Sequence, residues 1–282
     1  MPNQFILCLD YINRNMSIHS VSMKGKRPQN EDKHDIILNL DGANADNAPI
    51  NYYSVYDGHG GKFVSKFLHD HLPQCFTDKR VSYPLKKTFV KQIYNYWQNT
   101  LKNEYTKNSI NTGSTCLIAI NYKKDNCDYL NILNTGDSRC VLCRNNLGIP
   151  LTKDHKPNWP EEAARIKALG GQIIFDGFDW RINDLSVSRA FGDTNAGPYV
   201  TCMPDIFRYK ITDDDKFIVL ACDGLWDVFD CQDVVNFVLE NCYDIVSGTR
   251  TNNHINVAKR LAEFAIAKGS NDNVTIIVVF FQ

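Results

Sequence analysis

Two aspartate–glycine pairs lie far apart in the chain, each directly after a run of apolar residues: Asp57-Gly58 and Asp223-Gly224. Runs rich in β-branched and aromatic residues predict strands, so each pair places a carboxylate in a turn at a strand end. Such pairs often do no more than make the turn. Carboxylates on rigid strand ends, beside flexible backbone, are also what a divalent cation with oxygen ligands needs.

Two further acids at strand boundaries strengthen the metal hypothesis. Asp137 follows an expected strand that ends at Asn134, and Asp272 comes just before the last apolar run. If the four carboxylates converge at one edge of the fold, their mutual repulsion requires cations nearby. Gly58 lacks a Cβ, so its carbonyl could approach a metal closely.

Neighbouring polar residues indicate which reaction such metals could serve. His59 lies inside this group, and an imidazole suits proton transfer near neutral pH better than a hard-oxygen metal site. Arg27 could bind a phosphate through its planar guanidinium, while Glu31 and Asp32 could hold metals or metal-bound waters. In isolation, a charged loop explains these last three residues equally well.

Apolar runs and turn residues predict the elements that must position these groups. The expected strands are 35–40, 51–56, 114–122, 129–134, 139–144, 206–209, 216–222 and 273–281, and the expected helices are 62–72, 84–107, 160–169, 232–241 and 255–268. Pro84 and Pro160 each suit the first turn of a helix. Because no linker-like stretch separates the halves, we expect one domain built from packed sheets and helices.

Composition excludes several classes of protein. The net charge of −1 gives no overall attraction to nucleic acid, and 43% hydrophobic residues suffice for a large core. The longest apolar run, Val274–Phe281, is too short to cross a bilayer, and Pro2 excludes N-myristoylation. The ten cysteines are irregularly spaced, with one lone CxxC, which favours reduced thiols over zinc. We therefore expect a cytoplasmic protein without a membrane anchor, leaving the nucleus open.

Eight short motifs occur along nearly the whole chain: RPQNED (27–32), DGHGG (57–61), GST (113–115), NTGDSR (134–139), DHKP (154–157), SRAFGD (188–193), ACDGLWD (221–227) and GSNDNVT (269–275). Together and in this order they resemble the motifs of the metal-dependent PP2C-type (PPM) protein serine/threonine phosphatases. The resemblance implies an α+β fold, a four-layer α-β-β-α sandwich of two antiparallel sheets flanked by helices. It places a short lead-in at 1–15, a single domain at 16–282 and a flap-like segment at about 156–200.

The resemblance also implies a pair of Mn²⁺ or Mg²⁺ ions at one end of the sandwich. By motif position, Asp57 is similar to the ligand that bridges the two ions, and Asp223 and Asp272 are similar to ligands of the first ion. The Gly58 carbonyl and Glu31 are similar to ligands of the second ion, Glu31 either directly or through water.

The remaining site residues follow from the same comparison of motifs. Asp32 is expected to support the metal ligands, and Asp137 with Asp223 resembles the place where some relatives hold a weaker third ion. Arg27 resembles the phosphate-binding arginine and His59 the proposed general acid. The implied reaction is hydrolysis of phosphoserine and phosphothreonine monoesters in protein substrates, by attack of a water that bridges the two ions.

Two rival functions stay open at this stage. A pseudophosphatase would bind partners without turnover, but such proteins typically lack some of the metal acids, which are all present here. A metal phosphodiesterase acting on nucleic acid is disfavoured by the absence of a basic stripe. The sequence departs from the family pattern at 181–185 and at 193–200, which leaves substrate specificity open, and we expect a monomer.

Overall fold

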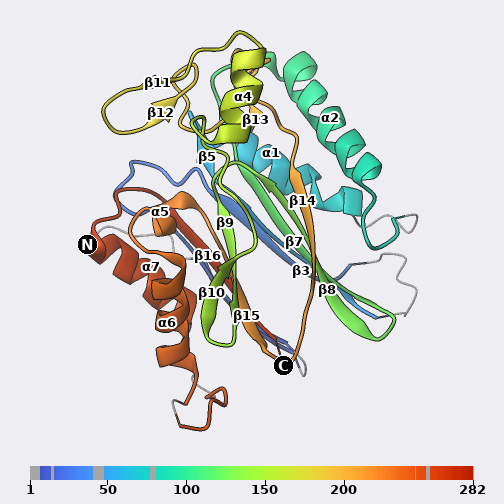
Figure 1. Cartoon of the computed structure of the whole chain (residues 1–282), viewed down its shortest axis with the longest axis vertical. Coiled ribbons are helices and arrows are strands. Elements are labelled where there is room, and N and C mark those ends of the chain that lie inside the picture. Colours follow the sequence, from blue (N-terminus) through green and yellow to red (C-terminus); the bar gives the residue numbers. More distant parts are fainter. Residues whose placement is uncertain are drawn as a thin grey trace.

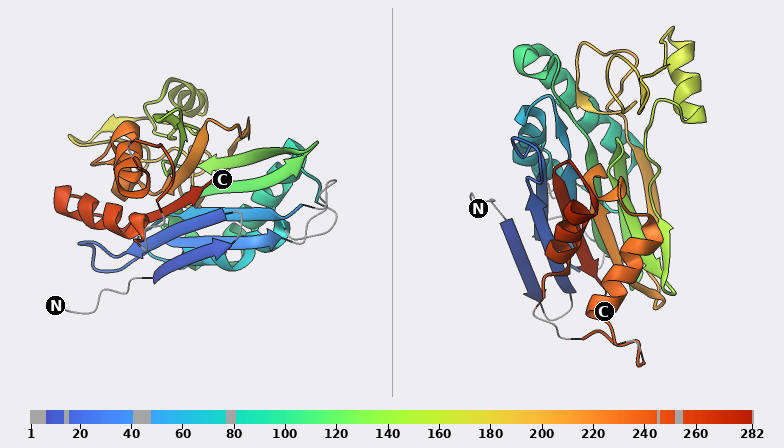
Figure 2. Two further views of the ribbon diagram at one scale, coloured as in Figure 1. Left: turned by 90° about the horizontal axis from the view of Figure 1, so that it is seen from below. Right: turned by 90° about the vertical axis from the view of Figure 1, so that its left-hand side faces the viewer.

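Two antiparallel sheets pack face to face, and helices cover the outer face of each sheet (Figures 1 and 2). The computed structural model describes residues 7–13, 16–40, 48–76, 81–244, 246–251 and 255–281. This arrangement confirms the expected α+β sandwich with four layers in the order α-β-β-α.

The first sheet has six strands in the order β1-β2-β16-β15-β9-β10. Their bounds are β1 (Leu7–Asn13), β2 (Met16–Met23), β9 (Arg139–Arg144), β10 (Leu147–Pro150), β15 (Asp215–Ala221) and β16 (Val274–Phe280). Three helices supply the side chains that cover its outer face: α5 (Asp223–Trp226), α6 (Cys231–Cys242) and α7 (Val257–Lys268).

The second sheet has five strands in the order β14-β8-β7-β4-β3. Their bounds are β3 (Lys33–Leu40), β4 (Ile50–Tyr56), β7 (Cys116–Lys124), β8 (Cys127–Thr135) and β14 (Asp205–Lys210). Its outer face is covered by α1 (Phe63–His71) and α2 (Lys87–Glu104), with the short helices η1 (Pro73–Phe76) and α3 (Thr106–Ser109) at their ends.

Smaller elements complete the end of the sandwich that carries the predicted site. A three-stranded sheet joins β5 (Gly58–His59), β6 (Gly113–Ser114) and β13 (Phe191–Gly192). Beside it, the segment 156–200 contains α4 (Pro160–Ala168) and a hairpin of β11 (Ile174–Phe175) and β12 (Trp180–Arg181), at the top of Figure 1.

Side-chain alternation along the central strands builds three separate layers of core. In β15, Phe217 and Val219 face the helices, while Ile218 and Leu220 face the opposite sheet. Because successive strand residues point to opposite faces, a segment buried on both faces is apolar throughout, as β15 is from Phe217 to Ala221. Such strands are rigid, so the residues at their ends are held in place.

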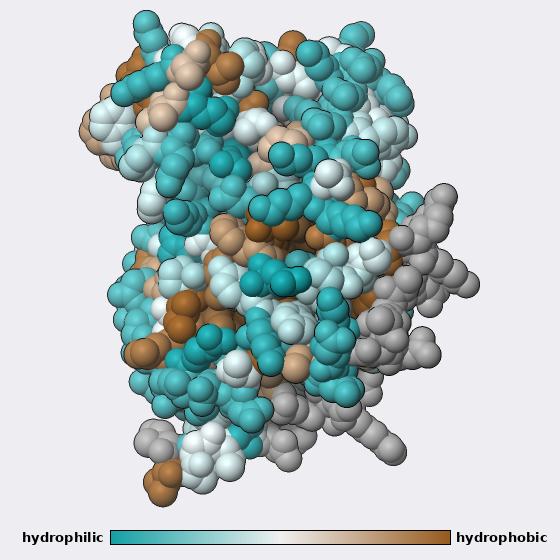
Figure 3. Space-filling model, turned by 45° about the vertical axis from the view of Figure 1, so that its right-hand side comes forward, coloured by the Kyte–Doolittle hydropathy of each residue, from teal (hydrophilic) through white to brown (hydrophobic). Residues whose placement is uncertain are grey.

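The molecular surface is mainly polar where it can be seen. Hydrophilic residues dominate the face drawn in Figure 3, and hydrophobic residues show as smaller patches near its upper end, across its middle and at its lower left. The exposed apolar side chains include a group on the β11–β12 hairpin: Ile174, Phe175, Phe178 and Trp180. Within the described ranges, none of the helices has the length and apolar character needed to cross a membrane.

The structure corrects two expectations about the elements. The predicted helix start at Pro84 is wrong, since α2 begins at Lys87. The N–H of Leu85 donates to Asn131 Oδ1 at 3.1 Å, which ties this backbone to β8 instead. Strands also occupy 7–13 and 16–23, where the sequence predicts no element. The second of them, β2, is hard to predict because its buried serines weaken the hydrophobic alternation.

The departure from the family pattern at 181–185 forms an ordered tight turn without glycine. Ile182 and Leu185 exchange two backbone hydrogen bonds of 3.0 Å, and both central residues have positive φ: 46° at Asn183 and 67° at Asp184. In turns with positive φ at both central positions, the preferred sequence is asparagine followed by glycine.

Asp184→Gly is therefore expected to stabilise the protein, by about 1 kcal/mol or about 2 °C in Tm. Asp184→Ala is the matched control, because alanine also removes the carboxylate but keeps the Cβ that disfavours positive φ. Thermal unfolding of the two variants measures the difference. If alanine stabilises as much as glycine does, the effect comes from the lost charge and not from the backbone.

Candidate active site

A cavity of about 370 Å³ opens at the end of the sandwich where the strand-end aspartates meet. Its lining contains eight of the nine predicted site residues: Arg27, Glu31, Asp57, Gly58, His59, Asp137, Asp223 and Asp272. The ninth, Asp32, is buried behind the lining, with an exposed fraction of 2%. The structure thus brings together residues that are up to 245 positions apart in the chain.

Three carboxylates form the centre of this cavity. Asp57, Asp137 and Asp223 each offer an oxygen, and these oxygens lie within 4.8 Å of one another. Asp57 follows β4 and Asp137 follows β8 in one sheet, whereas Asp223 follows β15 in the other. Asp223 begins the short helix α5 and does not sit in the tight glycine turn that its sequence suggests.

Burial and mutual repulsion make these acids hard to ionise together. Burial raises the pKa of Asp57 well above its usual value, and the charges of Asp223 and Asp32 raise it further. The pKa of Asp223 is raised in the same way, by burial and then by Asp137. An oxygen-rich cluster of this kind is stable in its charged form only beside cations.

Asp32 contributes a buried acceptor that points to the same conclusion. Its Oδ2 accepts a hydrogen bond of 2.6 Å from Thr275 Oγ1, but its buried Oδ1 has no hydrogen-bond partner among the described residues. Burial raises the pKa of Asp32 to about 6. Its neighbours Asp57 and Cys222 complete a second group of potential ligand atoms within 4.8 Å. The donor set, mostly carboxylate oxygen, fits Mn²⁺ or Mg²⁺.

The backbone around Asp57 and Gly58 is tightly constrained. Asp57 N–H donates to Thr115 Oγ1 at 3.1 Å, and Thr115 N–H donates to the Asp57 carbonyl at 2.9 Å. A Cβ on Gly58 would lie 2.5 Å from the Glu31 carbonyl oxygen and 2.8 Å from Ser65 Oγ. Only glycine fits here, so the glycine of the motif allows the segment around Glu31 to lie against this turn.

Glu31 and Arg27 enter the cavity from the loop between β2 and β3. Glu31 N–H donates to Asn273 Oδ1 at 2.8 Å, and Glu31 Oε2 accepts from Gly61 N–H at 3.1 Å. Arg27 Nη2 lies 2.6 Å from Asp272 Oδ2, with 56% of the arginine side chain exposed. The guanidinium is therefore at the rim of the cavity, where an incoming anion would meet it first.

His59 has a partner that the sequence reasoning did not identify. Its Nε2 lies 2.6 Å from Oδ2 of Asp193, whose side chain is only 2% exposed. Burial alone would lower the pKa of His59, but the hydrogen bond to Asp193 and the Asp193 charge raise it. A Cβ on Gly113 would lie 2.0 Å from that Asp193 oxygen, which explains the glycine of the GST motif.

Lys156 is the second functional candidate that was missed. Its Nζ forms an ion pair with Oδ2 of the buried Asp137. Both Lys156 and Asp193 belong to motifs that the family resemblance includes, DHKP and SRAFGD, so the signal was present in the sequence. No local pattern connects either residue to its partner, because the partners lie 19 and 134 positions away.

Comparison with known proteins finds relatives of this chain. The family model described as Protein phosphatase 2C matches residues 16–274. The chain is 36% identical to Protein phosphatase 2C homolog 3 of Schizosaccharomyces pombe over 274 residues, which are 92% of this chain and 63% of that protein. It is 46% identical to PP2C-like domain-containing protein R307 of Acanthamoeba polyphaga mimivirus over 169 residues, 54% of this chain and 94% of that protein.

A solved structure shows the same fold. The serine-threonine phosphatase 2C from Toxoplasma gondii superimposes with a TM-score of 0.80 and 23% sequence identity, and the match covers 100% of each chain. At this identity the likeness concerns the fold alone. The cavity, its carboxylates and the surrounding polar contacts come from the chain itself.

Proposed function

Because the chain belongs to the protein phosphatase 2C family, we propose that it hydrolyses phosphoserine and phosphothreonine monoesters in proteins with the help of two divalent cations. The observation that carries this proposal is the meeting of Asp57, Asp137 and Asp223 in one cavity with Arg27 and His59. Carboxylates suit cations, and the arginine and the histidine suit a phosphoryl group and a leaving oxygen.

We assign the metal-holding groups by their place in the cavity and in the family motifs. Asp57 would contact both ions, Asp223 and Asp272 the first, and Glu31 with the Gly58 carbonyl the second. When bound, Mn²⁺ or Mg²⁺ would activate water for attack on phosphorus and offset the charge of the acids.

Asp32 and Asp137 extend this assignment beyond the two main ions. Asp32 would support the ligands from behind, since it is buried directly beside Asp57. Asp137 would join Asp223 at a weaker third ion and already has Lys156 as a counter-charge.

The chain's own side chains would then orient the phosphoryl group and move the proton. Arg27 would hold the phosphoryl oxygens through its planar fork at the rim of the cavity. His59 would donate its proton to the leaving serine or threonine oxygen. Asp193 would keep that proton on His59 at neutral pH, because its carboxylate raises the pKa of the imidazole.

Asp193→Asn is expected to shift the basic limb of the pH–rate profile to lower pH and to reduce kcat by about 10-fold. The sign follows from the His59 pKa, which falls when the carboxylate is lost, so the protonated acid disappears at lower pH. A pH series of kcat on a phosphoserine peptide measures the shift. The matched control is Asp213→Asn, an exposed aspartate in the turn before β15. An unmoved basic limb would show that His59 is not the titrating acid.

An assay of the purified protein on phosphoserine and phosphothreonine peptides, with Mn²⁺, with Mg²⁺ and after chelation, tests the function directly. We expect turnover with either ion and none after chelation. Binding of a phosphopeptide without turnover would support a pseudophosphatase instead, and faster cleavage of a phosphate bis-ester would support a phosphodiesterase. A monomeric state and a cytoplasmic location stay predictions, which sedimentation and cell imaging can test.

A further inference from the structure

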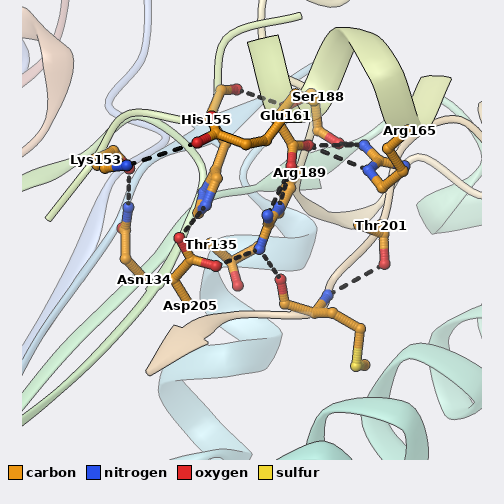
Figure 4. Close-up of polar contacts among 12 residues, drawn as sticks. Asn134, Thr135, Lys153, His155, Glu161, Arg165, Ser188, Arg189, Thr201 and Asp205 are labelled. Carbon is orange, nitrogen blue, oxygen red and sulfur yellow. Dashed lines mark hydrogen bonds and ion pairs between the residues drawn. The ribbon is translucent and has the colours of Figure 1, made fainter. Parts of the chain in front are cut away.

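We propose that a buried polar network centred on His155 positions the Gly136-Asp137 peptide in the active site, so that His155 is a positioning residue for the reaction. This inference rests on the proposed function, because it assumes that Asp137 serves that site. It concerns a residue outside the cavity lining that is hydrogen-bonded to the turn carrying Asp137. Figure 4 shows His155 among its polar neighbours.

His155 forms hydrogen bonds with both backbone polar groups of Gly136, the residue before Asp137. Gly136 N–H donates to His155 Nδ1 at 3.1 Å, and His155 N–H donates to the Gly136 carbonyl at 3.0 Å. Gly136 has a φ of +103°, and a Cβ there would lie 2.6 Å from Thr115 Cγ2. A glycine in this conformation has many alternatives in the absence of restraints. These two bonds, with a third from Asn134 Nδ2 to the Gly136 carbonyl at 3.2 Å, restrict where the next residue, Asp137, points.

The other ring nitrogen connects His155 to a chain of charges. Since Nδ1 accepts a hydrogen bond, the proton of a neutral imidazole is on Nε2, which lies 3.3 Å from Asp205 Oδ2. Asp205 Oδ1 accepts from Arg189 Nη1 at 2.9 Å (Figure 4). Arg189 in turn contacts Glu162 Oε1 at 2.6 and 3.0 Å. Glu162 lies on helix α4, so its carboxylate connects this series of charged groups to that helix.

The two carboxylates of this chain stay ionised throughout the physiological range. The contact with His155 lowers the pKa of Asp205 to about 2, and the charge of Arg189 contributes to this. Burial would raise the pKa of Glu162, but Arg189 and Arg165 lower it to about 2. The carboxylates and guanidinium groups of this network are paired with one another, while His155 Nε2 makes only the 3.3 Å contact with Asp205 among the described residues. Such pairing favours a rigid arrangement, because breaking one ion pair leaves another charge buried without a partner.

The network also reaches residues 184–187, which belong to the lining of the cavity. Ser188, which directly follows this segment, donates to the His155 carbonyl through its N–H at 2.8 Å and its Oγ at 3.0 Å. Arg165 Nη2 donates to the Ser188 carbonyl at 2.9 Å. His155 is therefore hydrogen-bonded both to the turn that carries Asp137 and to the residue that follows the lining segment 184–187.

A conservative and a disruptive variant of His155 test the positioning role. His155→Ala keeps the backbone bond to the Gly136 carbonyl but removes the Nδ1 acceptor of Gly136 N–H. We expect it to lower kcat by about 10- to 100-fold with little change in KM, because Asp137 is then held less firmly while substrate contacts remain. His155→Asn should recover most of the loss, because its side-chain oxygen can accept from Gly136 N–H near the place of Nδ1. Equal kcat in the two variants would overturn the proposal, as would full activity in His155→Ala.

A pair of glutamates one position apart supplies the matched control for the network. Glu162→Gln removes the buried charge that forms the ion pair with Arg189. Glu161→Gln changes a carboxylate whose side chain is 71% exposed and whose ion pair, with Lys153 Nζ, is long at 3.8 Å. At a temperature where both variants are fully folded, we expect Glu162→Gln to lower kcat about 10-fold and Glu161→Gln to leave it unchanged. If Glu162→Gln lowers only Tm, the network is structural and nothing more.

Calorimetric titration with Mn²⁺ separates this inference from the proposed function. We expect the weakest Mn²⁺ binding event to lose affinity by about 10-fold in His155→Ala and Glu162→Gln, but not in Glu161→Gln. If the wild-type protein does not hydrolyse phosphopeptides, the proposed function fails and the titration still decides the network. Unchanged Mn²⁺ affinity in both network variants would overturn the positioning role of His155.

Discussion

Asp223→Asn is expected to lower kcat on a phosphoserine peptide by about 10³-fold while making the metal-free protein more stable. The loss of activity follows from the position of Asp223 in the carboxylate cluster, with oxygens of Asp57 and Asp137 within 4.8 Å. An amide has nearly the same shape but carries no charge, so it is a weaker ligand for a hard cation. Steady-state kinetics with saturating Mn²⁺ measures the loss.

The gain in stability has the opposite cause. Burial, Asp137 and Asp227 raise the pKa of Asp223, so without metal the folded protein is strained by this charge at neutral pH. Replacing it with a neutral amide should stabilise the metal-free protein by at least about 1 kcal/mol, or about 2 °C in Tm. Added Mn²⁺ should then raise Tm less than it does in the wild-type protein.

The opposite signs of these two effects make the prediction sharp. A substitution that merely damages the fold lowers both activity and Tm, whereas a metal ligand in a repulsive cluster lowers activity and raises metal-free Tm. Asp213→Asn, at the other end of β15, is the control and should change neither. Wild-type activity in Asp223→Asn would contradict the proposal that this cavity is the active site.

The aspartates of the site were predictable because they follow regular patterns. β4 and β15 are buried on both faces, so their apolar runs stand out, and Asp57 and Asp223 come directly after them. Order along the motifs then associated these residues with Glu31 and Asp272. The structure places all four in one cavity.

The contacts that tune the site were not predictable, because they join segments by tertiary packing alone. The motifs contain Asp193 and His155, but nothing near them in the sequence indicates that one meets His59 and the other Gly136. The same limit applies to β2. Its buried serines obscure the strand pattern in the sequence, and its pairing with β16 is a tertiary contact that the sequence does not show. Such pairings depend on which strand ends reach the same edge of the sandwich.

Stabilisation by Mn²⁺ is expected to grow steeply with pH between about 4 and 6. Without metal, Asp32 binds its proton more tightly in the folded protein, since burial raises its pKa from 3.8 to about 6. The pKa values of Asp57 and Asp223 are also raised, burial again being the largest cause. In this window the folded state holds more of these protons than the unfolded state, so these acids make stability fall as pH rises.

Other groups titrate with different signs and must be separated from the cluster. The lowered pKa values of Glu162 and Asp205, about 2 each, cause stability to be lost as pH falls below about 5, in the opposite direction to the cluster. His34 acts in the same window and likewise opposes the cluster, because burial lowers its pKa to about 4 and stability is lost as pH falls through that range. His34 lies on β3 outside the cavity lining, so its contribution is the same with and without metal.

The difference between metal-bound and metal-free stability therefore isolates the carboxylate cluster. Cations require the ionised acids, so each proton that binding displaces adds about 1.4 kcal/mol per pH unit to the stabilisation. Urea unfolding at a series of pH values, with chelator or with Mn²⁺, measures this difference. Asp223→Asn removes one displaced proton and should reduce the slope by about that amount, whereas Asp213→Asn should not. A difference that does not vary with pH would place the bound cations away from Asp32, Asp57 and Asp223.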